Sequence, residues 1–176
     1  MKKIMIIGCC GAGKSTLSRK LHAITKLELI HLDREYWQPN WTETNKVVWK
    51  QKVQKLVAKP EWIIDGNYGS TMDIRIEKAD TIIYLNYPTW KCLWRVIGRI
   101  LKNWGTARPD MNEGCKERFD FPFLKYVATF KRKQGKKIRE KLAAEQGNKQ
   151  IFIFRNDKEV DIFLENLKEE KRNATA

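Results

Sequence analysis

Gly8-Cys9-Cys10-Gly11-Ala12-Gly13-Lys14-Ser15 is the stretch of sequence that decides the fold of this chain. It matches the pattern G-x-x-x-x-G-K-[ST], in which backbone N–H groups of a glycine-rich turn cradle phosphate groups. An apolar run, residues 3–8, leads into this stretch, and an amphipathic segment, residues 14–26, begins at its end. A buried strand, a glycine-rich turn and a helix in this order predict a phosphate-binding loop, which we call the P-loop.

The residue types of the P-loop suit a nucleoside triphosphate with Mg²⁺, and we expect ATP. Glycines let the backbone curl so that successive N–H groups point inward. The lysine supplies a positive charge for the β- and γ-phosphates, and the serine offers a hydroxyl to Mg²⁺. The expected nucleotide-binding residues are Gly8, Cys9, Cys10, Gly11, Ala12, Gly13, Lys14, Ser15 and Thr16.

Short apolar runs alternate with amphipathic segments along the rest of the chain. Strands are expected at residues 3–8, 27–33, 61–65, 80–85 and 150–154. Helices are expected at residues 14–26, 43–58, from Pro88 onward, 122–145 with an interruption near Gly135, and around Val160 to Leu167. This alternation predicts an α/β sandwich with a buried parallel sheet, whose ligands lie beyond the carboxyl ends of its strands.

Two aspartates, Asp33 and Asp65, end predicted strands and should face the P-loop. Asp65 follows the apolar Trp62-Ile63-Ile64, and we expect it to act with Ser15 on the metal side of the site. Asp33 suits acceptor binding or proton abstraction. The alternative for either aspartate is an ordinary cap or turn residue. His31 is expected to be a packed or hydrogen-bonded histidine.

Several segments resemble one known group of proteins. Residues 8–17, His31-Leu32-Asp33 with Tyr36-Trp37, and Asp65-Gly66-Asn67-Tyr68 look like the adenylate-kinase-related proteins called DNA topology modulation proteins. Arg108-Pro109-Asp110-Met111, Gly114-Cys115 and Phe119-Asp120 continue the resemblance over most of the chain. It implies a single kinase-like domain over residues 1–176, with a five-stranded parallel sheet of order 2-3-1-4-5 and a lid. It also implies ATP binding, and it is compatible with phosphoryl transfer.

The acceptor side of the site is expected in the loops that follow the second and third strands. In adenylate kinases the Asp-Gly pair is followed by Phe-Pro-Arg, whose arginine helps to hold the acceptor nucleotide. Here Asn67-Tyr68 follow and the next arginine is Arg75, which disfavours AMP as the acceptor. The aromatic loop with Trp41 either stacks a base or sugar or simply packs. The expected acceptor-binding residues are Asp33, Tyr36, Trp37, Gly66, Asn67, Tyr68 and Arg75.

Residues 104–121 are expected to form the lid, because they combine glycines and a proline with arginines between two helices. Lid arginines stabilise the negative charge that spreads over a transferring phosphoryl group. The alternative is a rigid surface connection with solvated charges. The expected catalytic residues are Lys14, Asp33, Arg95, Arg99, Arg108 and Arg118.

The charge balance points to acidic partners. The chain has 35 Lys and Arg against 21 Asp and Glu, a formal charge of +14. Nucleotides, DNA and an anionic surface all fit such a charge, as does a merely lysine-rich surface. A second function therefore stays open: a nucleotide-binding protein that binds DNA, for instance through residues 131–139, and influences its topology with weak or no kinase activity.

The remaining features suggest a cytoplasmic protein with no membrane partner, either a monomer or a dimer. No apolar stretch approaches the ~20 residues of a membrane-spanning helix. The four cysteines lack the spacing of a zinc site and are expected to be free thiols. They are Cys9, Cys10, Cys92 and Cys115.

Overall fold

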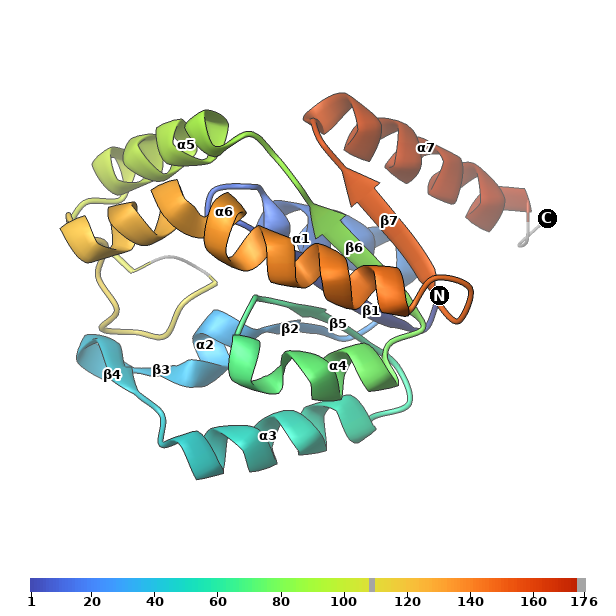
Figure 1. The fold of residues 1–176 in the computed structure, drawn as a ribbon, viewed down its shortest axis with the longest axis horizontal. Helices are drawn as coiled ribbons and strands as arrows, with labels where there is room; N and C mark the ends of the chain where they lie inside the picture. The colour runs from blue at the N-terminus through green and yellow to red at the C-terminus, as the bar shows by residue number, and fades with distance from the viewer. Residues whose placement is uncertain (108–109, 174–176) are drawn as a thin grey trace.

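A five-stranded parallel sheet forms the centre of the computed structural model, which describes residues 1–107 and 110–173 (Figure 1). Its order is β2-β5-β1-β6-β7, and every pairing is parallel. The strands are β1 (Lys3–Gly8), β2 (Leu29–His31), β5 (Trp62–Asp65), β6 (Thr81–Leu85) and β7 (Gln150–Phe154).

The labels of this order differ from the predicted 2-3-1-4-5 because the prediction counted only five strands. The structure has two further short strands, β3 (Trp37–Gln38) and β4 (Thr42–Glu43), which pair with each other outside the main sheet. Counted along the chain, the five strands of the main sheet stand in the order second, third, first, fourth, fifth.

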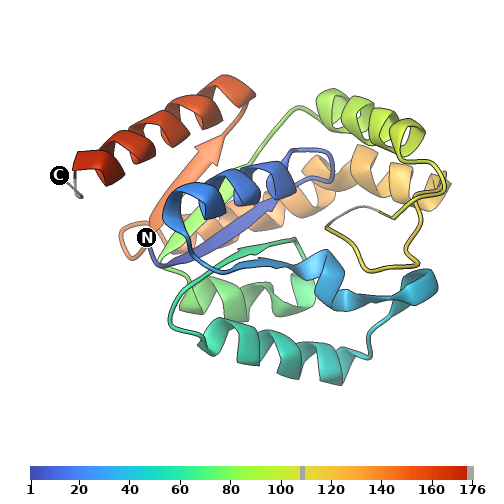
Figure 2. The ribbon, with the colours of Figure 1, turned by 180° about the vertical axis from the view of Figure 1, so that it is seen from behind.

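Helices cover both faces of the sheet. On one face, α4 and α6 lie toward the viewer in Figure 1, and α1 and α7 lie on the opposite face, which Figure 2 brings to the front. The helices are α1 (Lys14–Thr25), α2 (Leu32–Tyr36), α3 (Lys46–Ala58), α4 (Met72–Lys78), α5 (Thr89–Lys102), α6 (Phe121–Ala144) and α7 (Asp157–Asn173), with 3₁₀ turns at Pro39–Trp41 and Gly69–Thr71.

The central strands are apolar because helices exclude water from both of their faces. Ile4, Met5, Ile6 and Ile7 of β1 have no exposed surface. Strand β5 is equally buried along its whole length. Continuous apolar runs of this kind are typical of parallel sheets, and they hold the P-loop at a rigid sheet edge.

The region after β2 departs from the prediction. The strand stops at His31, so Asp33 lies in the first turn of α2 and does not end a strand. The predicted aromatic loop is the hairpin β3–β4. Its turn holds Asn40 and Trp41 at positive φ. Local sequence did not reveal these elements because packing of the aromatic rings stabilises them.

Two predicted helices also need correction. The helix predicted from residue 43 begins at Lys46, where the Asn45 side chain caps it by accepting a hydrogen bond from the Val47 N–H. Helix α6 continues through Gly135 without interruption. A Cβ at Gly135 would lie 3.2 Å from the Tyr84 hydroxyl oxygen, so this glycine lets α6 approach the sheet.

Helix α5 is apolar on two sides. Its buried side carries Cys92, Val96 and Ile100. Its other apolar side carries Ile97 and Leu101, which are exposed. No helix in the described part of the chain is long and apolar enough to cross a membrane.

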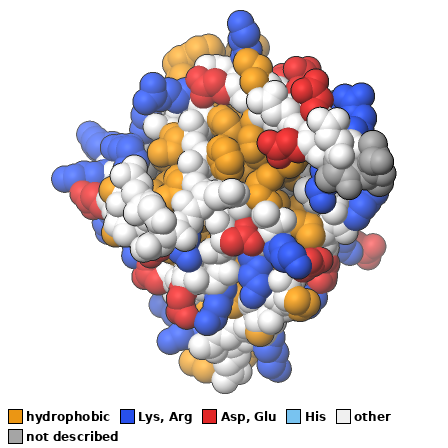
Figure 3. All heavy atoms as spheres, turned by 90° about the vertical axis from the view of Figure 1, so that its right-hand side faces the viewer, with side chains coloured by type: hydrophobic (Ala, Val, Ile, Leu, Met, Phe, Trp, Pro, Cys, Tyr) orange, Lys and Arg blue, Asp and Glu red, His pale blue; other side chains and the backbone are white. Residues whose placement is uncertain are grey.

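Charged side chains are spread widely over the surface. Figure 3 shows one face on which lysine and arginine side chains stand around the rim and hydrophobic side chains gather in the centre. The basic side chains of residues 131–133 and 136–137 are all exposed on α6. The four cysteines are free thiols, as predicted.

Candidate active site

The P-loop adopts a conformation that requires its glycines. Gly11 and Gly13 have φ values of 81° and 97°, in the left-handed region. A Cβ at Gly11 would lie 2.3 Å from the Cys92 carbonyl oxygen, so no larger residue fits there. Helix α1 begins directly afterwards at Lys14. A helix N-terminus behind a curled glycine loop favours the binding of an anion.

The Lys14 ammonium group lies across the start of the P-loop. Its Nζ donates to the carbonyl oxygens of Gly8 at 3.0 Å and Cys9 at 3.2 Å. A cavity of about 630 Å³ opens beside it, and we call this the P-loop cavity. Residues 10–17, Arg95, Arg99 and Asp157 are among those that line it.

Asp65 is buried and held in place by two donors. Its Oδ2 accepts hydrogen bonds from Ser18 Oγ at 2.7 Å and from His31 Nδ1 at 2.9 Å. Burial by itself would lower the pKa of His31, but the hydrogen bond and the charge of Asp65 outweigh it, so this pKa lies above its usual value. The histidine is therefore a positioning residue for Asp65, which lies at the edge of the P-loop cavity.

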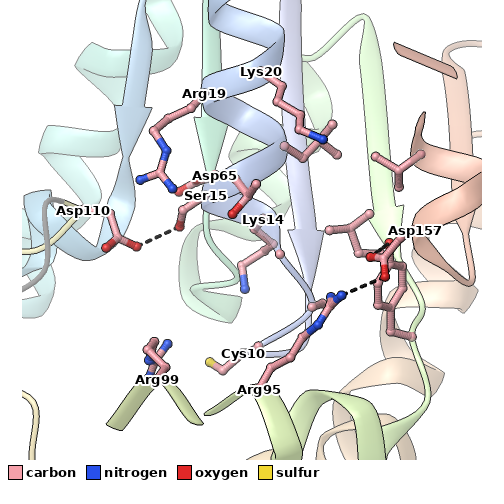
Figure 4. A pocket seen from close by; sticks show the side chains of 18 of the residues that line it. Cys10, Lys14, Ser15, Arg19, Lys20, Asp65, Arg95, Arg99, Asp110 and Asp157 are labelled. Atoms are coloured by element: carbon pink, nitrogen blue, oxygen red, sulfur yellow. Dashed lines mark hydrogen bonds and ion pairs between the residues drawn. The ribbon is translucent and has the colours of Figure 1, made fainter. Parts of the chain in front are cut away.

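A second carboxylate, that of Asp110, lies at Ser15. It was not among the site residues predicted from the sequence. The Asp110 Oδ2 accepts a hydrogen bond from Ser15 Oγ at 2.8 Å (Figure 4). Asp110 is 6% exposed and lines the P-loop cavity. Its only signal in the sequence was its place in the Arg108–Met111 segment, because no local pattern links residues 15 and 110.

The described residues contain no group of three or more His, Cys, Asp or Glu side chains that could hold a metal ion by themselves. This is compatible with Mg²⁺ at a P-loop. Such an ion takes few ligands from the protein and fills its coordination with water and phosphate oxygens. Ser15, Asp65 and Asp110 are the side chains on this side of the cavity that suit it.

The arginines Arg95 and Arg99 both line the P-loop cavity, and acidic partners hold both. Arg95 donates to Asp157 Oδ2 at 2.7 Å (Figure 4), and Lys91 donates to the same oxygen at 2.6 Å. Burial opposes ionisation of Asp157, but these donors outweigh it and lower its pKa to about 2. Arg99 Nε lies 3.2 Å from Glu117 Oε1.

A second cavity of about 740 Å³ lies on the other side of the P-loop, and we call it the aromatic cavity. Gly66, Asn67 and Arg118 line it but do not reach the P-loop cavity. Six aromatic rings contribute to its wall: Trp37, Trp41, Tyr68, Phe123, Tyr126 and Phe130.

The two cavities meet at four residues: Cys10, Lys14, Asp33 and Arg99 line both. At this junction Tyr68 Oη donates a hydrogen bond to Asp33 Oδ1 at 2.8 Å. Burial and the charge of Asp33 hold the pKa of the tyrosine well above its usual value, so its hydroxyl keeps its proton. Lys14 and Asp33 therefore both border the junction of the two cavities, although Asp33 does not end a strand.

Asn67 joins the two halves of the site. Its Oδ1 accepts from the Gly8 N–H at 3.0 Å, and its Nδ2 donates to the Gly8 carbonyl oxygen at 2.8 Å. This side chain therefore fixes the start of the P-loop relative to the end of β5. It was expected to bind the acceptor, and the structure shows a positioning contact at the edge of the aromatic cavity.

Two residues expected to bind the acceptor line neither cavity. Arg75 has no exposed surface, and its guanidinium group donates to the carbonyl oxygens of Gly66 at 2.8 Å, Tyr68 at 3.0 Å, Thr71 at 3.3 Å and Asn67. Burial lowers the pKa of Arg75 to about 9, so it remains charged at neutral pH. The sequence spacing did not reveal that Arg75 turns inward to these carbonyl groups.

Tyr36 is the other residue outside the cavities. Its ring lies 5.0 Å from that of Trp49 and 4.8 Å from that of Tyr68, measured between centroids. Its hydroxyl donates to Glu43 at 3.1 Å. Tyr36 therefore packs behind the cavity wall, whereas its neighbour Trp37 reaches the cavity.

The described part of residues 104–121 folds back onto the hairpin. Ala107 bridges to Lys116. Trp41 Nε1 donates to the Lys116 carbonyl oxygen at 3.0 Å, and Asn112 Nδ2 donates to the Trp37 carbonyl oxygen at 3.0 Å. Arg108, expected to be a lid arginine, lies outside the described residues. The segment connects the hairpin with Ser15, and the predicted lid motion stays a prediction.

No protein-family model matches the chain, and no curated protein matches it in sequence. Solved structures match the fold. A gluconokinase from Sinorhizobium meliloti 1021 has 15% identity over 99% of this chain and 98% of its own, with a TM-score of 0.53. A deoxyadenosine kinase from M. mycoides with bound dCMP and dCDP has 16% identity over 94% and 98%, with a TM-score of 0.50. A putative kinase from Chloroflexus aurantiacus J-10-fl has 13% identity over 94% and 96%, with a TM-score of 0.53.

At these identities the comparisons show the fold alone. The chain has the α/β fold of P-loop kinases, with a parallel five-stranded sheet. This confirms the predicted kinase-like fold class. The comparisons do not confirm the resemblance to DNA topology modulation proteins.

Proposed function

We propose that this protein is an ATP-dependent small-molecule kinase, which transfers the γ-phosphoryl group of Mg-ATP to a hydroxyl group of an acceptor. The observation that carries the proposal is the junction of the two cavities at Lys14 and Asp33. A phosphoryl transferase needs two substrate sites that meet at the transferring group. Kinases among the structural neighbours support the same reaction class.

The P-loop cavity suits the nucleotide. The backbone N–H groups of residues 11–16 would hold the phosphates, and Lys14 would exchange its two carbonyl partners for phosphate oxygens. Ser15, with Asp65 and Asp110 beside it, would hold Mg²⁺, which neutralises charge on the β- and γ-phosphates when bound. Arg95 and Arg99 line the same cavity and would stabilise the transferring group.

Asp33 suits the role of base toward the acceptor. One of its oxygens is held by Tyr68, which orients the carboxylate at the junction. The other oxygen can accept the proton of an acceptor hydroxyl as its oxygen attacks the phosphorus. This assigns orientation to Tyr68 and proton transfer to Asp33.

Residues 104–121 are proposed as the lid, within a single domain of residues 1–176. Asp110 already contacts Ser15, so movement of the segment would open or close the metal side of the P-loop cavity. Hydrogen exchange across this segment should slow when a bisubstrate analogue of ATP binds, and Arg108→Ala should lower kcat more than it weakens ATP binding. Equal exchange with and without the analogue would contradict the lid.

The function is tested by pairing ATP binding with turnover. Mg-ATP should raise the melting temperature, by the equivalent of about 2.7 kcal/mol at 100 times its dissociation constant, and EDTA should remove most of this gain. ATP consumption should depend on an added hydroxyl acceptor. Asp33→Asn should lower turnover about 10²- to 10⁴-fold while the stabilisation by Mg-ATP persists. A protein that Mg-ATP does not stabilise would contradict the proposal.

The alternative, a DNA-binding protein with weak or no kinase activity, is favoured by one observation: the exposed basic side chains of α6 within a chain of charge +14. Binding through Z phosphate contacts should weaken with salt along a log–log slope near −0.9Z. Measurable DNA affinity at physiological salt with no acceptor-dependent ATP consumption would favour this alternative.

For the kinase we propose a cytoplasmic location, where ATP is available.

A further inference from the structure

The wall of the aromatic cavity is suited to a flat ring. The rings of Trp37 and Trp41 lie 5.5 Å apart in an edge-to-face arrangement on one side. Tyr126 and Phe130 form a second edge-to-face pair, 5.7 Å apart, on helix α6. At about 740 Å³ the cavity lies within the usual range for small-molecule sites. Aromatic walls of this kind bind planar ligands by stacking.

The charges around the aromatic cavity are unsuited to a phosphorylated acceptor. Its described lining residues carry three cations, Lys14, Arg99 and Arg118, and Arg99 is paired with Glu117. Four carboxylates accompany them, those of Asp33, Glu43, Glu117 and Asp120. Recognition of a phosphate dianion normally uses several arginines or lysines. A monophosphate in this cavity would meet more negative than positive side chains.

Arg75 is the remaining candidate for binding an acceptor phosphate behind the Asp65-Gly66 turn, and its position excludes this role. It is fully buried, and its donors are used by four backbone carbonyl groups of the turn and the helix that follows. Release of this side chain would leave those carbonyl groups buried without donors. Arg75 therefore holds the turn at Gly66 and Tyr68, which line the aromatic cavity, and does not bind an acceptor phosphate.

The hydroxyl end of an acceptor must lie at Asp33. This carboxylate borders both cavities, as Lys14 does, and it is the acidic group that lines both. A ligand with its ring between the aromatic side chains and its hydroxyl at Asp33 would fill the cavity from wall to junction.

Building on the kinase function above, we propose that the acceptor is an uncharged compound with a planar ring and a hydroxymethyl group, which is the chemistry of a nucleoside and not of a nucleoside monophosphate. In the reaction the acceptor oxygen forms a bond to the γ-phosphorus. The bond from that phosphorus to the bridging oxygen breaks, and its electron pair leaves with ADP. The hydroxyl proton passes to the Asp33 carboxylate and then to solvent.

The test compares three acceptor sets with the full-length protein and Mg-ATP: nucleosides, their 5′-monophosphates, and polyols without a ring such as glycerol and gluconate. ADP formation gives the rates, and mass spectrometry identifies the products. At least one nucleoside should show a kcat/KM about tenfold or more above its monophosphate and above every polyol. A monophosphate or a polyol as the better substrate would overturn the nucleoside proposal and leave the kinase function standing.

Two further outcomes separate this proposal from the function on which it rests. If Mg-ATP stabilises the protein but none of the three sets is phosphorylated, the nucleoside proposal fails while nucleotide binding stands. If Mg-ATP does not stabilise the protein at all, the kinase function fails and the acceptor proposal falls with it.

A pair of variants tests the stacking wall directly. Tyr126→Leu removes a ring that lines the cavity and is 38% exposed, so the fold should tolerate it. It should raise KM for the preferred nucleoside about tenfold, the usual size of one lost base–aromatic stack, with little change in kcat. Trp90→Leu, on the outer side of α5 and 70% exposed, is the matched control and should change neither value. An unchanged KM in Tyr126→Leu would overturn the stacking role.

Discussion

The P-loop cavity and the aromatic cavity lie on either side of Lys14, but they are built in different ways. The wall of the P-loop cavity includes residues 10–17 in one continuous run, and the groups proposed to bind phosphate there are backbone N–H groups. The aromatic cavity collects side chains from the hairpin, the turn after β5 and helix α6. The proposed phosphate site is thus built from one local stretch of the chain, whereas the proposed acceptor site is lined by segments that only the fold brings together.

The largest expected effect tests the local side of this comparison. Lys14→Ala should lower turnover about 10²- to 10³-fold, because one preorganised charge at the transferring phosphate is lost. The melting temperature without nucleotide should change little, since the hydrogen bonds of Lys14 to described residues go to the carbonyl oxygens of Gly8 and Cys9 in the loop. Lys133→Ala, exposed on α6, is the control. A well-folded Lys14→Ala protein with full activity would refute the P-loop assignment.

The next effect concerns Arg75, which holds the turn at Gly66 and Tyr68 beside the aromatic cavity. Arg75→Met should lower the free energy of unfolding by about 3 kcal/mol or more, because buried carbonyl groups of Gly66, Asn67 and Tyr68 lose their charged donor. Urea unfolding measures the change, with the exposed Arg132→Met as control. If Arg75 instead held the acceptor, the variant would keep its stability and lose acceptor binding.

A smaller effect tests the connection between the two cavities. Asn67→Ala removes both hydrogen bonds to Gly8, and we expect a loss of about 1–2 kcal/mol in the free energy of unfolding. ATP affinity should fall as well, because the start of the P-loop is no longer fixed. Asn148→Ala, on an exposed turn, supplies the comparison. Unchanged ATP affinity in a destabilised Asn67→Ala protein would show that the contact supports the fold alone.

The smallest expected effect is a dependence of stability on pH. The folded pKa of His31 lies above its unfolded value of about 6.5 because of Asp65. Protonation of His31 therefore stabilises the fold fully below that unfolded pKa, and the contribution is lost as the pH rises through the folded pKa. The melting temperature should fall over this range more steeply than in His31→Gln. Parallel curves for the two proteins would contradict the His31–Asp65 pair.

Much of the framework was predictable because it depends on local patterns. Five apolar runs became the five strands of the main sheet, since runs of this kind are stable only between covering helices. Lys14 and Asp65 lie where the motif and the strand end placed them. The hairpin β3–β4 and the early end of β2 were missed, because the rings of Tyr36, Trp49 and Tyr68 stabilise that region through contacts distant in sequence.

The sequence by itself determined the P-loop, since glycine conformation, helix start and lysine position are set within eight residues. Only the tertiary structure decided which other polar residues belong to the site. It brought Asp110 to Ser15 across 95 residues, turned Arg75 inward and joined Tyr68 to Asp33. The physical reason is that a side chain's partner depends on burial and on neighbours from distant segments, and the spacing of residues along the chain carries no record of either.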